Sequence, residues 1–133
     1  MAEQELEIGR SVIAAARTAD LRRFVFHSVL HPQTAEMAHH WQKMRVEALL
    51  FRSGLDFTIL QPAAYMQNVL AGRDLITARG EYRVPYALST RIGMVDLLDV
   101  AEVAARVLSE DGHAGATYEL ATGERLSQHE VAT

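Results

Sequence analysis

A histidine and the chain's single lysine are the first residues whose types and spacing point to chemistry. Lys43 is the one lysine among thirteen basic residues, and the other twelve are arginine. His39 precedes Lys43 by four positions in a segment with helical periodicity, so both side chains share one helix face. A histidine can donate a proton near neutral pH, and an ammonium can hold a polar ligand. The pair could therefore address one bound molecule.

Two simpler interpretations of this helix stay open. Lys43 also precedes Glu47 by four positions, which is the spacing of an ordinary surface ion pair. His39 and His40 are adjacent, so their side chains point about 100° apart around a helix and do not converge on one metal ion. Because the two rings do not converge, no metal site is predicted.

Composition bounds the class of protein. The 133 residues carry a net charge of -4, are 49% hydrophobic and include no cysteine. One domain with its own core is expected, and a disulfide scaffold or a thiolate metal site is excluded. The acidic balance argues against nucleic-acid binding. No apolar run approaches the ~20 residues of a membrane span, and the acidic start is unlike a signal peptide. We therefore expect a cytoplasmic protein without nucleic-acid or membrane partners.

Helix and strand patterns alternate along the chain, which favours an α/β fold with a partly parallel sheet. Strands are expected over 24–30, 55–60, around 82–86 and over 117–121. Helices are expected over 6–19, 35–53 and 63–70, and after capping boxes that begin at Asp99 and Ser127. The helix over 35–53 carries an apolar stripe that is expected to face the core: Met37, Trp41, Met44, Ala48 and Phe51.

Four blocks of the sequence, in this order and at this spacing, carry a resemblance to a known family. They span 8–32, 39–68, 91–108 and 117–132, and the most specific stretches are SGLDFTILQP at 53–62 and MVD at 94–96 with DVA at 99–101. The chain resembles the second half of an NmrA-like protein, an atypical short-chain dehydrogenase/reductase. The resemblance implies a single domain over 1–133 with a partial Rossmann-like parallel sheet. Residues 1–71 would form the second half of the Rossmann-like unit, and 72–133 would form a small C-terminal substrate lobe.

The resemblance also implies roles for residues at two strand ends and on the helix between them. Lys43 would donate to the ribose hydroxyls beside the nicotinamide. His39 occupies the position of the wider superfamily's catalytic tyrosine and would take part in proton transfer. The other residues implied at the cofactor are His27, Ser28, Val29, Gln61, Pro62, Ala63 and Ala64, with Gln61 replacing the family's usual arginine. The residues implied on the substrate side are Tyr65, Met66 and Asn68.

The glycine-rich motif of dinucleotide-binding proteins is missing from this chain. That motif needs closely spaced glycines between a strand and a helix, where the backbone approaches the pyrophosphate. The glycines stand at 9, 54, 72, 80, 93, 112, 115 and 123, and no three have the required spacing. The chain is expected to keep the nicotinamide and substrate side of the family's NAD or NADP site and to lack the phosphate side.

Two functions follow from this pattern. The first is the C-terminal portion of an NmrA-like NAD(P)H-dependent oxidoreductase, which would act on a small carbonyl or quinone and be inactive alone. The alternative is a non-catalytic NmrA-like regulatory module that senses nucleotides or binds proteins. Without the first half of the sheet, one strand edge keeps open hydrogen-bonding groups. Homodimerisation or pairing through that edge is therefore expected.

Overall fold

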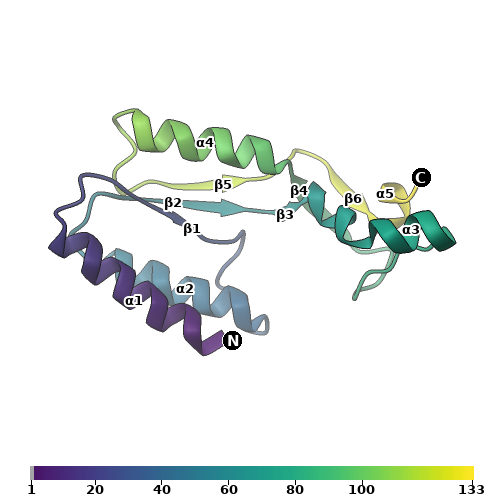
Figure 1. Cartoon of the computed structure of the whole chain (residues 1–133), viewed down its shortest axis with the longest axis horizontal. Coiled ribbons are helices and arrows are strands. Elements are labelled where there is room, and N and C mark those ends of the chain that lie inside the picture. The colour runs from purple at the N-terminus through teal and green to yellow at the C-terminus, as the bar shows by residue number, and fades with distance from the viewer. Residues whose placement is uncertain (1) are drawn as a thin grey trace.

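A parallel three-stranded sheet lies at the centre of the computed structural model, which describes residues 2–133 (Figure 1). Its strands are β1 (Phe24–His27), β2 (Phe57–Pro62) and β5 (Thr117–Leu120), in the order β1-β2-β5. All six residues of β2 are buried, as a central strand covered on both faces requires. The strands predicted over 24–30, 55–60 and 117–121 are thereby confirmed.

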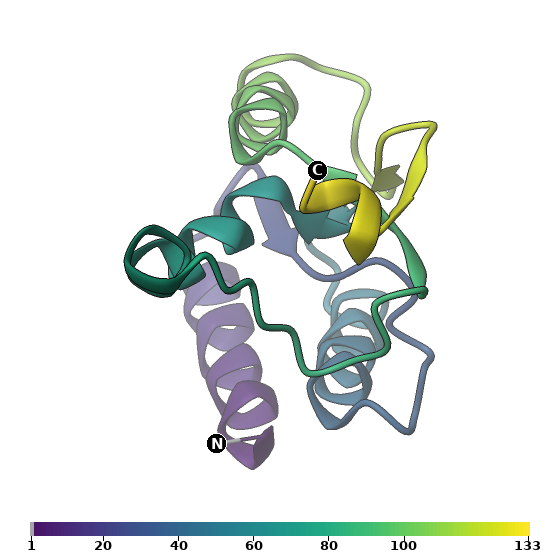
Figure 2. The same cartoon turned by 90° about the vertical axis from the view of Figure 1, so that its right-hand side faces the viewer.

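Helices cover both faces of this sheet. α1 (Ala2–Thr18) and α2 (Ala38–Leu50) lie together on one face, and α4 (Leu97–Ser109) lies on the other (Figures 1 and 2). This arrangement protects a parallel sheet from water on both sides. Within residues 2–133, no helix combines the length and the apolar character that a membrane crossing would need.

Gly9 allows α1 and α2 to approach closely. A Cβ atom added at Gly9 would lie 2.7 Å from Cγ2 of Val46 and 2.9 Å from its Cγ1. Around this contact, buried apolar side chains join both helices to β2: Leu6, Ile13, Val46, Leu50, Phe57 and Ile59. This cluster fixes the position of α2, the helix that carries Lys43.

A smaller lobe stands beyond the end toward which β2 points (Figure 1). Its strand β4 (Arg91–Val95) pairs in parallel with β3 (Ala64–Tyr65) and antiparallel with β6 (Arg125–Ser127). Three short helical segments complete the lobe: the 3-10 helix η1 (Met66–Gly72), α3 (Arg73–Arg79) and α5 (Gln128–Val131). The division of the chain at residue 71 stays a prediction.

Local capping confirms one predicted helix start and corrects another. Ser127 begins α5 in a full capping box, because its Oγ accepts from the Glu130 amide while the Glu130 carboxyl accepts from the Ser127 amide. The predicted cap at Asp99 is wrong. Asp96 caps α4 by accepting from the Leu98 amide at 2.7 Å, and Asp99 lies within the first turn.

Two further predictions about local structure are wrong. No strand forms around 82–86, because Tyr82 instead donates a hydrogen bond to Oε1 of Gln128 at 2.9 Å. The helix predicted over 63–70 begins later, as a 3-10 helix at Met66, because Ala64 and Tyr65 first pair with β4.

The apolar stripe of α2 lies outside the core, contrary to the prediction. Trp41 is 43% exposed and Phe51 is 63% exposed. The side of α2 that is buried instead carries Gln42, Val46, Glu47 and Leu50. The helix adopts this orientation because Glu47 finds hydrogen-bond donors in the sheet, as described below, so a polar residue turns inward and the stripe turns outward.

Candidate functional site

The predicted site residues gather where β1 and β2 end. β1 ends at His27, which Ser28 follows, and β2 ends at Gln61 and Pro62. Parallel strands all end at the same edge of their sheet, and ligands of open α/β sheets bind beyond that edge. α2 packs against this region and adds Lys43. The lobe stands on the same side (Figure 1).

Lys43 contacts three groups from two other elements. Its Nζ donates to the backbone oxygen of His27 at 2.9 Å and lies 2.8 Å from a carboxyl oxygen of Glu5 in α1. The ammonium also lies 5.1 Å from the centre of the Phe26 ring, within the range of a cation–π contact. The ordinary surface pair of Lys43 with Glu47 is not formed. An ammonium has three N–H groups, so two are occupied and one remains for a ligand.

Glu47 is a buried carboxyl group that the sequence interpretation missed. Glu47 is 5% exposed, and one of its oxygens accepts a hydrogen bond from the Ser28 hydroxyl. Nε2 of Gln61 donates to both carboxyl oxygens, at 3.0 and 3.1 Å. A buried polar group is costly unless it is hydrogen-bonded, and here three contacts from two donor groups converge on Glu47. Glu47 thereby ties α2 to the ends of β1 and β2. Polar residues at both strand ends were the signal that could have revealed it.

His27 and Tyr65 form a second polar contact at this edge. The Tyr65 hydroxyl lies 2.6 Å from Nε2 of His27, with the two rings tilted by 59°. Burial, with a smaller contribution from the Lys43 charge, lowers the pKa of His27 below its usual value. Burial raises the pKa of Tyr65. Both groups are therefore neutral near pH 7, and one hydrogen bond joins them, donated either by the hydroxyl or by Nε2.

His39 lies outside this hydrogen-bond network. It is exposed on α2, and its ring packs edge-on against His40, with 4.4 Å between the ring centres. Slight burial, followed by the charges of His40 and Lys43, lowers its pKa. Within residues 2–133 its ring makes no hydrogen bond. Its role in proton transfer stays a prediction.

The other predicted residues differ in what they can offer a ligand. The side chains of Ser28 and Gln61 already bind Glu47. Pro62 and Ala63 are buried, and their backbone groups pair with Leu30 and Leu120. The remaining residues lie beyond these strand ends, Val29 half-buried and the others exposed: Val29, Ala64, Met66 and Asn68. The structure thus joins His27, Ser28, Lys43, Gln61 and Tyr65 into contacts and leaves the others outside them.

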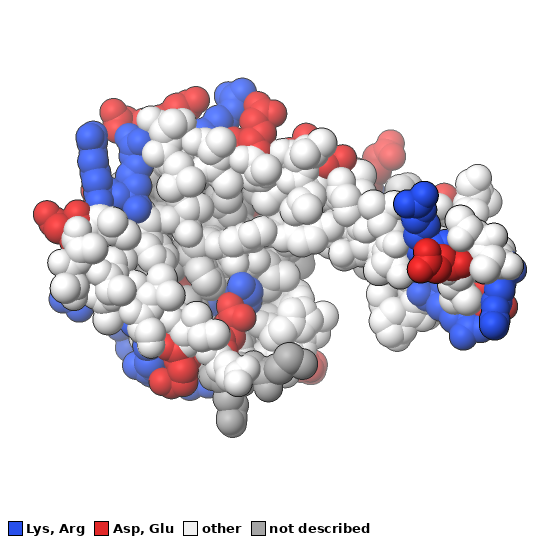
Figure 3. Space-filling view, viewed as in Figure 1, with Lys and Arg blue, Asp and Glu red and all other residues white. Residues whose placement is uncertain are grey.

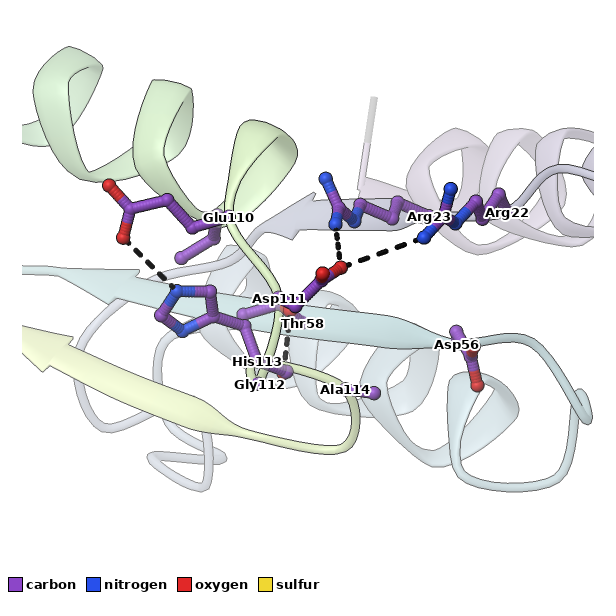
Figure 4. A pocket seen from close by; sticks show the side chains of 10 residues that line it. Arg22, Arg23, Asp56, Thr58, Glu110, Asp111, Gly112, His113 and Ala114 are labelled. Atoms are coloured by element: carbon purple, nitrogen blue, oxygen red, sulfur yellow. Dashed lines mark hydrogen bonds and ion pairs between the residues drawn. The ribbon is translucent and has the colours of Figure 1, made fainter.

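A cavity of 230 Å³ lies at the opposite edge of the sheet, where the strands begin (Figure 4). Several of its polar and charged groups lie close to a partner of opposite type. Arg23 binds both the Leu108 carbonyl and Asp111, and Arg22 lies 3.7 Å from Asp111. His113 approaches Glu110 at 3.9 Å. Figure 3 likewise shows positive and negative side chains next to one another at this end of the molecule. The cavity therefore holds its shape by internal pairing.

Comparison with known proteins places this geometry in a family. The model of the NmrA-like family matches residues 1–133. The chain belongs to the NmrA-like family. It is 34% identical over 112 residues to quinone oxidoreductase 2 of Escherichia coli K12, covering 84% of this chain and 39% of that protein. It is 28% identical over 130 residues to the NAD(P)H azoreductase of Xenophilus azovorans, covering 96% of this chain and 45% of that protein.

A solved structure extends this likeness to the fold. The crystal structure of an NADPH-dependent quinone oxidoreductase from Escherichia coli in complex with NADPH matches with a TM-score of 0.79 and 32% identity. The match covers 90% of this chain and 42% of that one. The Rossmann-like α/β class is therefore confirmed. The chain spans about two fifths of the length of these NmrA-like relatives.

Proposed function

We propose that this chain forms the nicotinamide and substrate side of an NAD(P)H-dependent oxidoreductase that reduces a small carbonyl compound or a quinone. The observation that carries the proposal is the position of Lys43. Its ammonium is held by Glu5 and the His27 carbonyl at the edge where the parallel strands end, with one N–H left for a ligand. The family's quinone and azo reductases support the same chemistry.

The residues at this edge fit one half of a nicotinamide cofactor. When bound, the cofactor supplies a hydride. Lys43 would donate to its ribose hydroxyls, as the family resemblance implies. His27 and Tyr65 offer polar groups beside it. Glu47, through Ser28 and Gln61, holds the two strand ends at a fixed separation, so the ammonium keeps its position relative to a ligand.

The phosphate half of the cofactor has no matching residues among 2–133. A pyrophosphate needs glycine backbone at the turn from a strand into a helix. The turns from β1 into α2 and from β4 into α4 contain no glycine. We therefore infer that the phosphates would be held by groups other than these, and that the described chain binds the cofactor weakly.

Calorimetric titration with NADPH tests the proposal. We expect weak, saturable binding that Lys43→Ala abolishes. Arg45→Ala is the matched control, because Arg45 is an exposed cation two positions away on the same helix. Equal binding by the wild type and Lys43→Ala would contradict the proposal.

Oxidation of NADPH in the presence of a quinone tests the inferred incompleteness. The described residues give the phosphates no cradle, so we expect turnover to be absent or very slow. Robust turnover by the 133-residue chain would show that the phosphate side is not needed.

A second candidate function is a protein-interaction module, and the edge of β1 favours it. β1 pairs with β2, and within residues 2–133 its other edge is open. On neighbouring α1, Ile8, Val12 and Ala15 form an exposed apolar face at helical spacing, and Ile8 is 61% exposed. An open edge beside an apolar face is what a second copy could cover by antiparallel strand pairing.

Light scattering at tens of micromolar tests this second function. We expect a dimer for the wild type. Val25→Pro should give a monomer, because the amide of Val25 points to the open edge while those of Phe24 and Ser28 pair with β2. A monomeric wild type would overturn the interaction module and leave the oxidoreductase proposal untouched.

A further inference from the structure

The side-chain contact between Tyr65 and His27 takes no part in holding Lys43 or Glu47. Tyr65 comes from β3 and His27 from the end of β1, and the 2.6 Å contact between the hydroxyl and Nε2 joins the lobe to the sheet. The His27 side chain is exposed, and its other ring nitrogen, Nδ1, makes no hydrogen bond to residues 2–133. One nitrogen therefore contacts the phenol and the other is open to water.

Among the described residues, Lys43 is the charged group that acts on His27. Lys43 donates to the His27 backbone oxygen, and Glu5 pairs with the same ammonium. Because the phenol and the imidazole are both neutral, the contact can take one of two forms. Either the Tyr65 O–H donates to Nε2, or an Nε2–H donates to the Tyr65 oxygen. The second form leaves the phenolic proton free to point at a ligand.

Resting on the proposed function, we propose that Tyr65 donates the proton to the oxygen of a quinone substrate, and that His27 positions it through an Nε2–H bond to the phenolic oxygen. His39, which stands at the superfamily's tyrosine position, lies outside this contact. Tyr65 supplies a phenol where the strands end, but it comes from β3 and not from α2, which carries His39.

The step balances as follows. A quinone becomes a hydroquinone by gaining one hydride and one proton. The hydride, with both electrons, comes from the reduced nicotinamide. The Tyr65 O–H bond breaks, and its proton forms the new O–H bond on the substrate. The Nε2–H bond of His27 stabilises the phenolate that results, because it already points at that oxygen. Reprotonation returns the Nε2 proton to Tyr65 while Nδ1 takes a proton from water.

Two measurements on the 133-residue chain test this proposal. The first is the His27 tautomer, read from long-range ¹H–¹⁵N correlations near pH 7.5, where we expect the proton on Nε2. The second is titration with 2-methyl-1,4-naphthoquinone followed by NMR. This probe meets no thiol, because the chain contains no cysteine. We expect Tyr65→Phe to weaken quinone binding about fivefold, as the loss of one hydrogen bond predicts, with the native fold retained.

The opposite edge of the sheet offers a matched control. There Tyr118 contacts Nδ1 of His113 at 2.8 Å, so Tyr118→Phe removes a hydroxyl from a similar histidine–tyrosine pair. We expect this variant to leave quinone binding unchanged. A proton on Nδ1 of His27, absence of quinone binding, or equal affinity of Tyr65→Phe and the wild type would each overturn the proposal. The titration needs no cofactor, so a failure of Lys43-dependent NADPH binding would overturn the proposed function separately.

Discussion

The two edges of the central sheet carry similar groups and use them differently. Each has a histidine–tyrosine contact: His27 with Tyr65 where the strands end, and His113 with Tyr118 where they begin. At the starting edge, where the strands begin, Nε2 of His113 lies near Glu110, and both arginines of this edge lie near Asp111. At the ending edge, where the strands end, Nδ1 of His27 stays open to water. The difference teaches that polar groups where the strands end stay available to a ligand, whereas the paired groups where the strands begin do not.

The largest effect is expected from Glu47, which holds the ending edge together. Glu47→Ala would leave the Ser28 hydroxyl and the Gln61 amide buried without an acceptor, at a cost of about 3 kcal/mol in the free energy of unfolding. Asp111→Ala, at the starting edge, should cost much less because exposed ion pairs contribute little. Urea denaturation monitored by circular dichroism measures both, and equal losses would remove the contrast between the edges.

A smaller loss is expected where α1 meets α2. Gly9→Ala would place a Cβ atom 2.7 Å from Cγ2 and 2.9 Å from Cγ1 of Val46, closer than two carbon atoms pack. We expect a loss of about 1–2 kcal/mol, since overpacking outweighs the better helix propensity of alanine. Val46→Ala makes room, so Gly9→Ala should be neutral or stabilising in that background. An unchanged penalty in the double variant would show that the contact is not its cause.

The start of α4 gives a test with a smaller expected effect. Asp96 accepts from the Leu98 amide and also from Nε2 of Gln67, which follows β3. Asp96→Ala should therefore cost about 1 kcal/mol in thermal or urea unfolding. Asp99→Ala, three positions later, should change stability little. A larger loss of stability for Asp99→Ala than for Asp96→Ala would instead support Asp99 as the helix cap, as the sequence pattern indicated.

The smallest expected effect is a change in the titration of His27. Its pKa is lowered by burial first and by the Lys43 charge second, so Lys43→Met should move the NMR midpoint part of the way back toward its usual value. The folded state binds fewer protons at His27 than the unfolded state does below about pH 6.5. This contribution to stability is present above that pH and is lost as the pH falls. No shift of the midpoint in Lys43→Met would contradict the contact geometry.

Much of the fold could be predicted from local pattern. The strands over 24–30, 55–60 and 117–121 formed because short β-branched and aromatic runs bounded by turns have few alternatives. The Ser127 capping box formed because all of its partners lie within three residues. Local pattern could not decide between two possible caps where the outcome depended on contacts with residues far away in the sequence. At α4, Asp96 and Asp99 are both plausible caps by type, and the pairing of β4 decided between them.

The orientation of α2 shows why the site was predicted only in part. Its apolar stripe has helical spacing, and so does the buried side, on which Glu47 accepts hydrogen bonds from Ser28 and Gln61. Those partners lie 19 and 14 residues away, beyond the reach of periodicity. Likewise, the Tyr65 contact with His27 spans 38 residues. The family resemblance predicted which residues lie near the candidate site. The contacts among these residues could be seen only in the three-dimensional structure.

The most direct test of the account is an NMR titration of the ¹⁵N-labelled chain with NADPH, reading both edges of the sheet in one experiment. We predict that the backbone amides of His27, Ser28 and Gln61 shift, while those of Arg23 and His113 stay in place. Lys43→Ala should remove the shifts. Shifts centred on Arg23 and His113, or shifts at the strand ends that persist in Lys43→Ala, would contradict the assignment of the nicotinamide side to the ending edge.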